Sequence, residues 1–496
     1  MGSIISLFYC AAWAGSGHIE LSASQSKGLV GSIEFYECRL SNLSELFSRK
    51  AECAYVNVPE NHQQPDSKQL DIFVARLKSN AAKAKKDAVL MIAGGPGQAA
   101  SQAYLNADRI YKKVSRQRDI YLIDQRGTGR SNRMDCPELS SVRLEKQFDA
   151  NLAKTLTKAC LENLPGDPRF YTTSVAIKDL ELIRKALAIP QWNLMGASYG
   201  SRVELHYLKK YPKSIRTAVM DSVIPPEYSL GPAIAMESQR ALEKMFEACR
   251  LDDDCNDKYP NLEQGVSSLL DGLEKSPRDI TIENFSTGKQ ESIKYTKNHL
   301  AVVLRFSLYS HLTVSILPAM LHEAYANNNL APLARQSMGN LKQLNNMLSV
   351  GMHHAVLCTE DFPFFKESDL ERNSSAATYL GDAIIEGIKS TCEVWPSGII
   401  DKDFKQAVAS DVPVLLFSGS ADPITPPSYA DVAAKHLSDS LHIVVQGQGH
   451  GVSHLGCAPT IVAKFIDMAS FDGIKTKCLD KIKPAPFFID FNGPSA

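Results

Sequence analysis

The chain has 496 residues, of which 44% are hydrophobic and 22% are charged, and its formal net charge at pH 7 is −1. That length and hydrophobic content are enough for a large core with an inserted or second domain. The near-neutral charge gives no reason to expect nucleic acid or another polyanion as a partner, and it excludes an acidic solvating tail as a main feature. The oligomeric state is left open.

Residues 1–14 carry no charged side chain. The apolar run is too short to cross a bilayer as a helix, so no integral membrane segment is expected here. Residues 12–14, Ala-Trp-Ala, fit the small-x-small pattern before a signal-peptidase cut, although no Lys or Arg precedes them. Gly2 and Ser6 also fit the looser myristoylation pattern. We expect a signal peptide at 1–14 and an exported protein, periplasmic or secreted.

Ten of the 11 cysteines lie beyond that segment, and an even number there is typical of a protein from an oxidising compartment. Connectivity cannot be deduced from sequence, but pairing of neighbours along the chain is the simplest hypothesis. Buried free thiols in a cytosolic protein are the alternative. No Cys-x-x-Cys occurs, so a zinc site has no support. The hypothetical pairs are Cys38/Cys53, Cys136/Cys160, Cys249/Cys255, Cys358/Cys392 and Cys457/Cys478.

Residues 29–80 have the pattern of an antiparallel β region, in which residues 70–77 alternate between apolar and polar. Residues 88–92 and 120–123 are continuous apolar runs, as expected for strands that are covered on both faces. A helical pattern at 171–188 follows. Strands that alternate with helices in this way favour a mostly parallel sheet with helices on both faces.

The first buried run ends in Gly-Gly-Pro-Gly at 94–97, and the second ends at Asp124. Gly95, Gly97 and Ala100, with Asp124 after the next strand, imitate a dinucleotide-binding fingerprint. The proline at position 96 argues against that interpretation, because it removes an N–H from the loop that would hold a pyrophosphate. The alternative is an oxyanion loop, whose backbone N–H groups face a tetrahedral intermediate. We expect no nucleotide cofactor.

Residues 192–195 form a short buried-strand pattern, and residues 201–211 follow with helical spacing. Between them lies Gly-Ala-Ser-Tyr-Gly at 196–200. Strand, tight turn and helix are the context of a nucleophile elbow, in which glycines flank a serine with a strained backbone. An ordinary glycine–serine turn is the alternative. We expect Ser198 to be a nucleophile.

The pattern changes after the buried-strand run at 217–221. From about residue 230 to residue 405 helical stretches dominate, broken by a predicted hairpin at 280–294, and strand patterns return at 412–417 and 441–445. We therefore expect a mostly parallel twisted sheet flanked by helices, with an inserted, mainly helical cap. The expected division is a core at 29–229, a cap at 230–405, a second part of the core at 406–478 and a C-terminal tail at 479–496.

Within the cap, residues 252–263 place acidic or amide side chains at positions one, three, five and twelve of a calcium loop. Asp257 stands where that loop needs glycine, and Pro260 interrupts it. This stretch is therefore interpreted as a solvated acidic turn. We expect neither a metal nor a cofactor.

A serine hydroxyl is a poor nucleophile at neutral pH, so a base must take its proton and an acid must orient the base. Asp422 follows one of the late strand patterns, and His450 follows the last, between two glycines. Ser198, Asp422 and His450 stand in the order expected after a nucleophile elbow. We expect them to be the nucleophile, the orienting acid and the base. The backbone N–H groups of Tyr199 and Gly95 are expected to hold the oxyanion.

Other residues compete for these roles. Asp221 also ends a strand pattern, but it precedes the cap. His454 lies in the segment after the expected base and is interpreted as a packing or surface residue. His353 and His354 belong to the cap. All four rank below the residues named for the triad.

The motifs as a set resemble one family: Gly94-Gly95-Pro96-Gly97, Asp124-Gln125-Arg126 with Ser131, Gly196-Ala197-Ser198-Tyr199-Gly200, Ser420-Ala421-Asp422-Pro423 and Gly449-His450-Gly451. They resemble the prolyl aminopeptidase and tripeptidyl aminopeptidase branch of the α/β-hydrolases, over about residues 38–478. The resemblance implies an α/β-hydrolase fold with a helical cap, and a serine aminopeptidase that acts through an acyl-enzyme. Ala93 departs from the pattern, since many prolyl members have histidine there.

The resemblance also implies peptide substrates that are bound by their free amino terminus, so that carboxylates are needed near the cap. The acidic segment 358–361 looks like that of the cap in such members. Glu360 is therefore the first candidate, Asp361 the second and Glu227 the third, with surface solvation as the alternative for all three. A carboxylesterase for small or lipid-like esters, and a hydrolase-like binding protein without turnover, remain open. Epoxide hydrolases and dehalogenases are disfavoured because they have Asp in place of Ser198.

Overall fold

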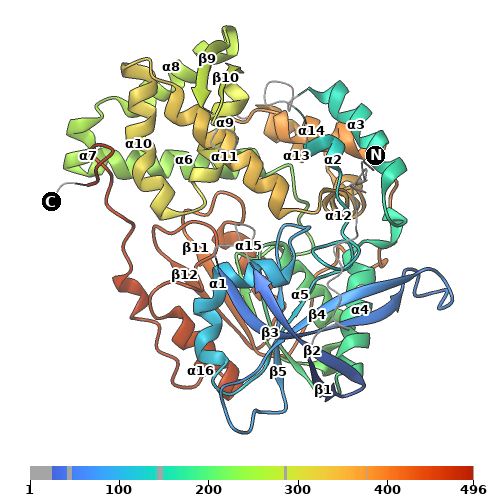
Figure 1. Ribbon diagram of the computed structural model, residues 1–496. Coiled ribbons are helices and arrows are strands. Elements are labelled where there is room, and N and C mark those ends of the chain that lie inside the picture. The colour runs from blue at the N-terminus through green and yellow to red at the C-terminus, as the bar shows by residue number, and fades with distance from the viewer. Residues whose placement is uncertain are drawn as a thin grey trace, which may run out of the picture.

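The computed structural model describes residues 25–494, apart from residues 42–46, 141, 143–148, 284–287 and 376. The predicted signal peptide, residues 1–14, lies outside the described part. A large twisted sheet forms the centre of the molecule, with helices on both of its faces and a mainly helical region beyond one end of the strands (Figure 1).

The sheet has 10 strands in the order β1-β2-β3-β4-β6-β5-β7-β8-β11-β12. The first four strands and the β4–β6 pair are antiparallel, whereas the pairs from β6 through β12 are parallel. The order steps back at β5, so that the β5 and β7 loops are neighbours. The strands are β1 (Ser26–Val30), β2 (Ile33–Ser41), β3 (Ser48–Pro59), β4 (Gln69–Leu77), β5 (Ala88–Ile92), β6 (Ile120–Ile123), β7 (Trp192–Ala197), β8 (Ile215–Asp221), β11 (Val414–Gly419) and β12 (Ser440–Val445).

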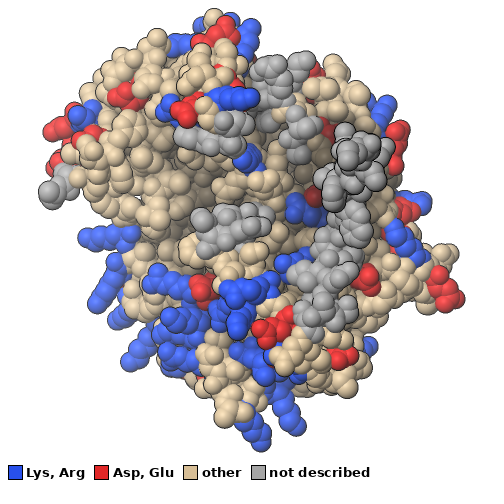
Figure 2. All heavy atoms as spheres, viewed as in Figure 1, with Lys and Arg blue, Asp and Glu red and all other residues tan. Residues whose placement is uncertain are grey.

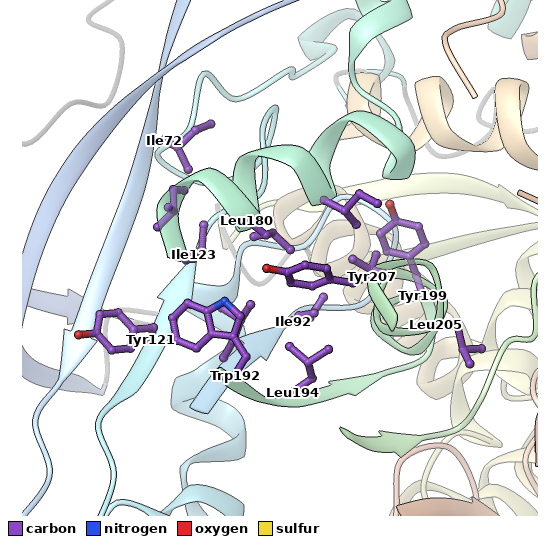
Figure 3. Packing of buried hydrophobic residues seen from close by; sticks show 14 of the residues in the cluster. Ile72, Ile92, Tyr121, Ile123, Leu180, Trp192, Leu194, Tyr199, Leu205 and Tyr207 are labelled. Atoms are coloured by element: carbon purple, nitrogen blue, oxygen red, sulfur yellow. The ribbon is translucent and has the colours of Figure 1, made fainter. Parts of the chain in front are cut away.

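The continuous apolar runs of the sequence form the central strands of the sheet, whose two faces are both covered by helices. Every residue of β5, β6 and β11 is buried. One face packs against α1 (Ala100–Val114) and α16 (Ala458–Met468), and the other packs against α4 (Thr173–Ala186), α5 (Tyr199–Lys210) and α15 (Pro427–Ala434). Figure 3 shows the second face, where the ring of Trp192 meets the ring of Tyr121 at 5.4 Å between centroids.

The helical region lies between β8 and β11 and has its own apolar core. Its hairpin pairs β9 (Arg278–Glu283) with β10 (Gln290–Tyr295) in antiparallel register. We call the chain between β8 and β11 the insertion. Its helices are α6 (Ile234–Leu251), α7 (Asp253–Lys258), α8 (Leu262–Lys275), α9 (Lys297–Ser307), α10 (His311–Ala326), α11 (Ala331–Met347), α12 (Val350–Val356), α13 (Glu367–Ser375) and α14 (Ala383–Cys392), while α2 (Pro137–Ser140) and α3 (Ala150–Asn163) precede β7.

Two details of the insertion go beyond what the sequence pattern indicated. Residues 300–327 have a continuous helical pattern in the sequence, but they are divided between two helices, because Ser310 accepts a hydrogen bond from the N–H of Leu312 and begins α10. The acidic turn carries no calcium-loop geometry, since Asp252 caps α7 by accepting the N–H of Cys255 at 2.9 Å.

The neighbour pairing of the ten cysteines is confirmed: the structure has the five disulfides of that hypothesis. Cys358–Cys392 ties the acidic segment of the insertion to α14. The predicted architecture, a mostly parallel sheet flanked by helices with an additional helical region, is also confirmed. None of the described helices has the length and hydropathy that a membrane crossing requires.

Charge on the visible face is distributed unevenly. Figure 2 shows Lys and Arg gathered over the lower part, around α1 and α16, whereas the surface of the insertion above it is mostly uncharged. Lys112, Lys113 and Lys464 on these two helices are exposed. On this face, the basic side chains therefore gather mainly over the helices that cover the sheet.

Candidate active site

Ser198 sits at the turn between β7 and α5 with φ 56° and ψ −126°, a strained conformation for a residue with a side chain. Its N–H donates to the carbonyl of Asp221 at the end of β8, at 2.9 Å. A β-carbon on Gly200 would lie 2.6 Å from the carbonyl oxygen of Ile92, so the turn requires glycine there. The side chain of Ser198 is thereby held at the carboxyl end of the parallel strands, in the geometry of a nucleophile elbow.

Asp422 follows β11 and is fully buried. Its Oδ2 lies 2.8 Å from Nδ1 of His450. The same oxygen accepts the hydroxyls of Ser222, at 3.0 Å, and Thr425, at 2.8 Å, while Oδ1 accepts the N–H groups of Ile424 and Thr425, both at 2.9 Å. These donors fix the carboxylate, and the carboxylate fixes the imidazole with the proton on Nδ1 and the free lone pair on Nε2.

The two side chains also set one another's charge. Burial by itself would raise the pKa of Asp422, but the neighbouring His450 and the hydrogen bonds outweigh it, and the pKa lies below the ordinary value. Burial would lower the pKa of His450, yet the charge of Asp422 and its hydrogen bond raise it above the ordinary value. An ionised carboxylate beside an imidazole of raised basicity is the arrangement that general base catalysis needs.

The end of β8 joins the elbow to the histidine loop. Beyond its contact with Ser198, Asp221 accepts the N–H groups of residues 452 and 453 on Oδ2, both at 2.7 Å. Ser222 accepts the N–H of Gly451 at 2.8 Å. Asp221 therefore holds the backbone of the loop and not the ring of His450. Within the described residues the Ser198 hydroxyl makes no hydrogen bond, so the structure brings the acid and the histidine into contact and places the serine at the same strand edge.

The Gly-Gly-Pro-Gly loop after β5 lies against the elbow. A β-carbon on Gly94 would stand 3.5 Å from Cβ of Ser198 and 3.1 Å from the carbonyl of Ala197. Tyr199 is the first residue of α5, where backbone N–H groups have no partner inside the helix. The loop and the helix start thus flank the serine from two sides. The oxyanion roles of Tyr199 and Gly95 stay predictions.

The other histidines have different surroundings. Nδ1 of His353 donates to the carbonyl of Pro96 at 3.1 Å, which holds the loop beside the elbow. Burial lowers the pKa of His354 to about 3, so its ring is neutral, and it packs edge-on against Trp395. His454 is exposed. Among the described residues, none of these three histidines makes a contact with a carboxylate like that of His450.

The insertion reaches the histidine loop through the segment after α9. The N–H of His450 donates to the carbonyl of Tyr309 at 2.8 Å, and the tyrosine ring lies edge-on to the imidazole with centroids 5.1 Å apart. Arg305 stands in the last turn of α9. Neither residue was singled out from the sequence, although both lie, four residues apart, inside the stretch 300–327 that has a helical pattern.

Glu360 is fully buried in the single π-helical turn η5 (Leu357–Asp361). Its carboxylate accepts the N–H of Thr173 at 2.6 Å and the hydroxyl of Thr173 at 2.9 Å. Burial raises its pKa to about 7, against the opposing charge of Arg202. The alternative of surface solvation is wrong for this residue.

Asp361 is also fully buried, and its two oxygens both lie 2.9 Å from Nη1 of Arg202 on α5. It also accepts the N–H of Leu230 at 2.9 Å. Lys405 is 3.6 Å away, and burial lowers the pKa of that lysine to about 8. Surface solvation is wrong here too, because Asp361 balances a buried arginine that sequence analysis did not single out.

Glu227 lies in the loop after β8 and is half-buried. Its Oε2 is buried, and it has no hydrogen-bond partner among the described residues. The next residue, Tyr228, offers its carbonyl to Nη2 of Arg202 at 2.9 Å. Of the three acidic candidates, Glu227 is the one with an unused carboxylate oxygen.

Comparison with known families agrees with this geometry. A family model described as the alpha/beta hydrolase fold matches residues 87–251, which include Ser198. A model described as TAP-like protein matches residues 377–478, which include Asp422 and His450. The chain belongs to the TAP-like α/β-hydrolases. The resemblance expected from the motifs is thus confirmed, and the protein is a serine hydrolase of this family.

Some relatives align along most of this α/β-hydrolase, and others along a smaller part. YuaR of Escherichia coli (strain K12) is 24% identical over 458 residues, which cover 86% of this chain and 88% of the relative. Serine protease Hip1 of Mycobacterium tuberculosis (strain ATCC 25618 / H37Rv) is 24% identical over 461 residues, 86% of each chain. The tripeptidyl aminopeptidase of Streptomyces lividans is 27% identical over 191 residues, 35% of this chain and 36% of that one.

Solved structures align over most of their length at low identity. The crystal structure of proline iminopeptidase from Mycobacterium smegmatis is 13% identical and covers 84% of this chain and 98% of its own, with a TM-score of 0.37. The thermophilic esterase from Thermogutta terrifontis is also 13% identical, with a TM-score of 0.35 and coverage of 84% and 97%.

Proposed function

We propose that this protein is a serine aminopeptidase, which removes a residue or a short peptide from the free amino terminus of peptides through an acyl-enzyme on Ser198. The observation that carries the proposal is the 2.8 Å contact between Asp422 and His450 at the strand edge that also holds the strained Ser198. Relatives named as a serine protease and as a tripeptidyl aminopeptidase support peptides as the substrate class.

In the proposed reaction, Oγ of Ser198 attacks the scissile carbonyl while Nε2 of His450 takes its proton. Asp422 stays ionised and stabilises the imidazolium that forms. The N–H groups of Tyr199 and Gly95 donate hydrogen bonds to the former carbonyl oxygen and stabilise its negative charge. His450 then gives its proton to the leaving amine, and the C–N bond breaks. A water molecule, deprotonated by His450, hydrolyses the ester and restores the serine.

The free amino terminus of the substrate needs a carboxylate, and the surroundings of the three candidates favour Glu227. Asp361 already balances Arg202, and Glu360 already accepts two hydrogen bonds from Thr173. The buried Oε2 of Glu227 has no such partner among the described residues, and an ammonium group would supply one. We therefore propose Glu227 as the direct contact. Asp361 remains balanced by Arg202, and Glu360 adds negative charge only above its pKa of about 7.

We also propose that the protein acts outside the cytoplasm, with residues 1–14 removed on export. Five disulfides support an oxidising compartment, because such bonds do not persist where thiols are kept reduced. The proposed division into a core at 29–229 and 406–478, with a cap at 230–405, agrees with an insertion that begins after β8 and ends before β11.

Purified protein is tested with free and amino-blocked di-, tri- and tetrapeptidyl 4-nitroanilides, beside short acyl 4-nitrophenyl esters. We expect cleavage of the free peptides, poor cleavage of the blocked ones, and labelling of Ser198 by a fluorophosphonate. Hydrolysis of the esters alone would favour a carboxylesterase. Absence of labelling and of turnover would favour a binding protein, and either result would refute the aminopeptidase.

A further inference from the structure

Arg305 is a cation without a counter-charge. It lies half-buried in the last turn of α9. Its Nε is buried and has no hydrogen-bond partner, and no ion pair involves this side chain in the described part of the chain. A buried guanidinium nitrogen without a hydrogen-bond partner costs free energy. This arginine therefore differs from Arg202, which shares the site with Asp361.

The guanidinium is linked to the proposed base through two aromatic side chains. Its Cζ lies 5.4 Å from the centre of the Phe306 ring, and that ring stacks on Tyr309 with centroids 5.6 Å apart. Tyr309 in turn holds His450 through its carbonyl and its ring edge. The side chain of Arg305 is thus tied through aromatic contacts to the residue that contacts the histidine, which limits its freedom to turn outward.

The electrostatic effect of Arg305 extends over both sides of the nucleophile. Its charge adds to burial in lowering the pKa of His353, which holds the loop on the oxyanion side. It also opposes the rise in the pKa of His450 that Asp422 causes. The charge of Arg305 therefore acts on two histidines, His353 beside the loop at residues 94–97 and the proposed base His450.

Three acidic side chains of the site have other partners, and the fourth, Glu227, is assigned to the amine of the substrate. Asp422 is taken by His450 and by its own loop, Asp361 by Arg202, and Asp221 by the backbone of the histidine loop. No acidic side chain among the described residues forms an ion pair with Arg305, which leaves this arginine able to pair with an anion of the substrate. A guanidinium matches the two oxygens of a carboxylate better than it matches any neutral group in a peptide.

We propose that Arg305 binds a carboxylate of the substrate beside His450, on the side where the leaving group receives its proton. The proposal rests on the proposed peptidase function and narrows its substrates. The carboxylate has two possible sources, the free carboxyl terminus of a short peptide and an acidic side chain close to the cut. With Glu227 at the amino end, the first source would make the site a clamp for short zwitterionic peptides.

Binding is measured by calorimetry on the Ser198→Ala protein, so that no probe is consumed. Trialanine is compared with trialanine amide, and Ala-Glu-Ala amide with Ala-Gln-Ala amide. We expect the probe with the relevant carboxylate to bind about 10- to 100-fold more tightly than its neutral partner. A difference in the first pair identifies the carboxyl terminus, and a difference in the second identifies the side chain. Equal binding of the two probes within both pairs would overturn the proposal, and this test needs no variant of Arg305.

Variants then assign the effect to this residue. Arg305→Met should abolish the discrimination and leave the binding of the neutral probes unchanged, and Arg305→Lys should keep part of it as a point charge. The control is Arg250→Met, which removes an exposed arginine of the insertion that is paired with Glu247. If Arg305→Met does not fold, Arg305→Lys serves as the test. Unaltered discrimination between charged and neutral probes in that variant, together with unaltered salt dependence, would count against a bidentate contact.

The outcome is separable from that of the proposed function. Cleavage of free peptides by the native protein tests the aminopeptidase, whereas the calorimetric comparison needs no turnover. The protein could show no peptidase activity and still distinguish charged from neutral probes through Arg305. That result would support the carboxylate site and refute only the proposed reaction. Equal weakening of charged and neutral probes by Arg305→Met would show a structural role and refute the site.

Discussion

The buried carboxyl of Glu360 should make the stability of the protein depend on pH. Burial, opposed by the charge of Arg202 and the hydrogen bonds of Thr173, raises its pKa to about 7 from an ordinary value of 4.5. A carboxyl whose folded-state pKa is raised stabilises the folded state below its unfolded pKa, and that contribution is lost as the pH rises through the folded pKa. The window is therefore pH 4.5 to about 7.

The expected size follows from the same shift. The pKa rises by the difference between 7 and 4.5, and each unit corresponds to about 1.4 kcal/mol, so ionisation should cost about 3 kcal/mol of folding free energy. Glu360→Gln removes the ionisation and keeps the shape. Its carbonyl oxygen can accept the N–H of Thr173, and its amide can donate to the Thr173 hydroxyl, so the local hydrogen bonds are retained.

The measurement is urea unfolding of the native chain and of Glu360→Gln at several pH values, with disulfides intact. The variant should gain stability relative to the native chain by about 3 kcal/mol between about pH 4.5 and about pH 8. Glu371→Gln, at an exposed position on α13, is the control for the amide substitution itself. A difference that stays flat across this range, or that grows toward acid, would refute the assignment of a raised pKa to Glu360.

Three further predictions concern the site. Asp422→Asn should lower kcat by about 10⁴-fold, as loss of the orienting acid does in serine hydrolases. It should also move the acid limb of the pH–rate profile to lower pH, because Asp422 raises the pKa of His450. An acid limb that does not move would refute that coupling. Glu227→Gln should raise KM for substrates with a free amine and spare amine-blocked esters, and Glu360→Gln should do the same more weakly; equal loss on both substrate types would discard these roles. Gly200→Ala should abolish fluorophosphonate labelling or folding, since its β-carbon would meet the carbonyl of Ile92 at 2.6 Å; native labelling and melting would show that the elbow tolerates a side chain.

The sheet and the nucleophile elbow were predictable because each depends on local sequence. A strand that is buried on both faces is a continuous apolar run, and the residues at its carboxyl end, such as Asp422 after β11, follow directly in the chain. The order of strands then places these ends along one edge. The position of Ser198 needed no long-range information beyond that order.

The environment of the acidic residues was not predictable in the same way. Whether Glu360 and Asp361 face solvent depends on Arg202 and Thr173, which lie more than a hundred residues earlier in the chain. The break between α9 and α10 depends on a single capping hydroxyl at Ser310 inside a stretch with continuous helical pattern. Contacts of this kind decide burial and charge balance, and a linear pattern does not record them.

The hydrogen bond from the N–H of His450 to the carbonyl of Tyr309 makes the two halves of the molecule depend on each other. The proposed base is anchored on one side by a carboxylate of the sheet and on the other by the main chain of the helical region. Exchange of that region between homologues would therefore preserve turnover only where the main-chain path around residues 308–310 is kept. New specificities in such enzymes should arise by altering side chains along the helices, while that short connection remains unchanged in shape.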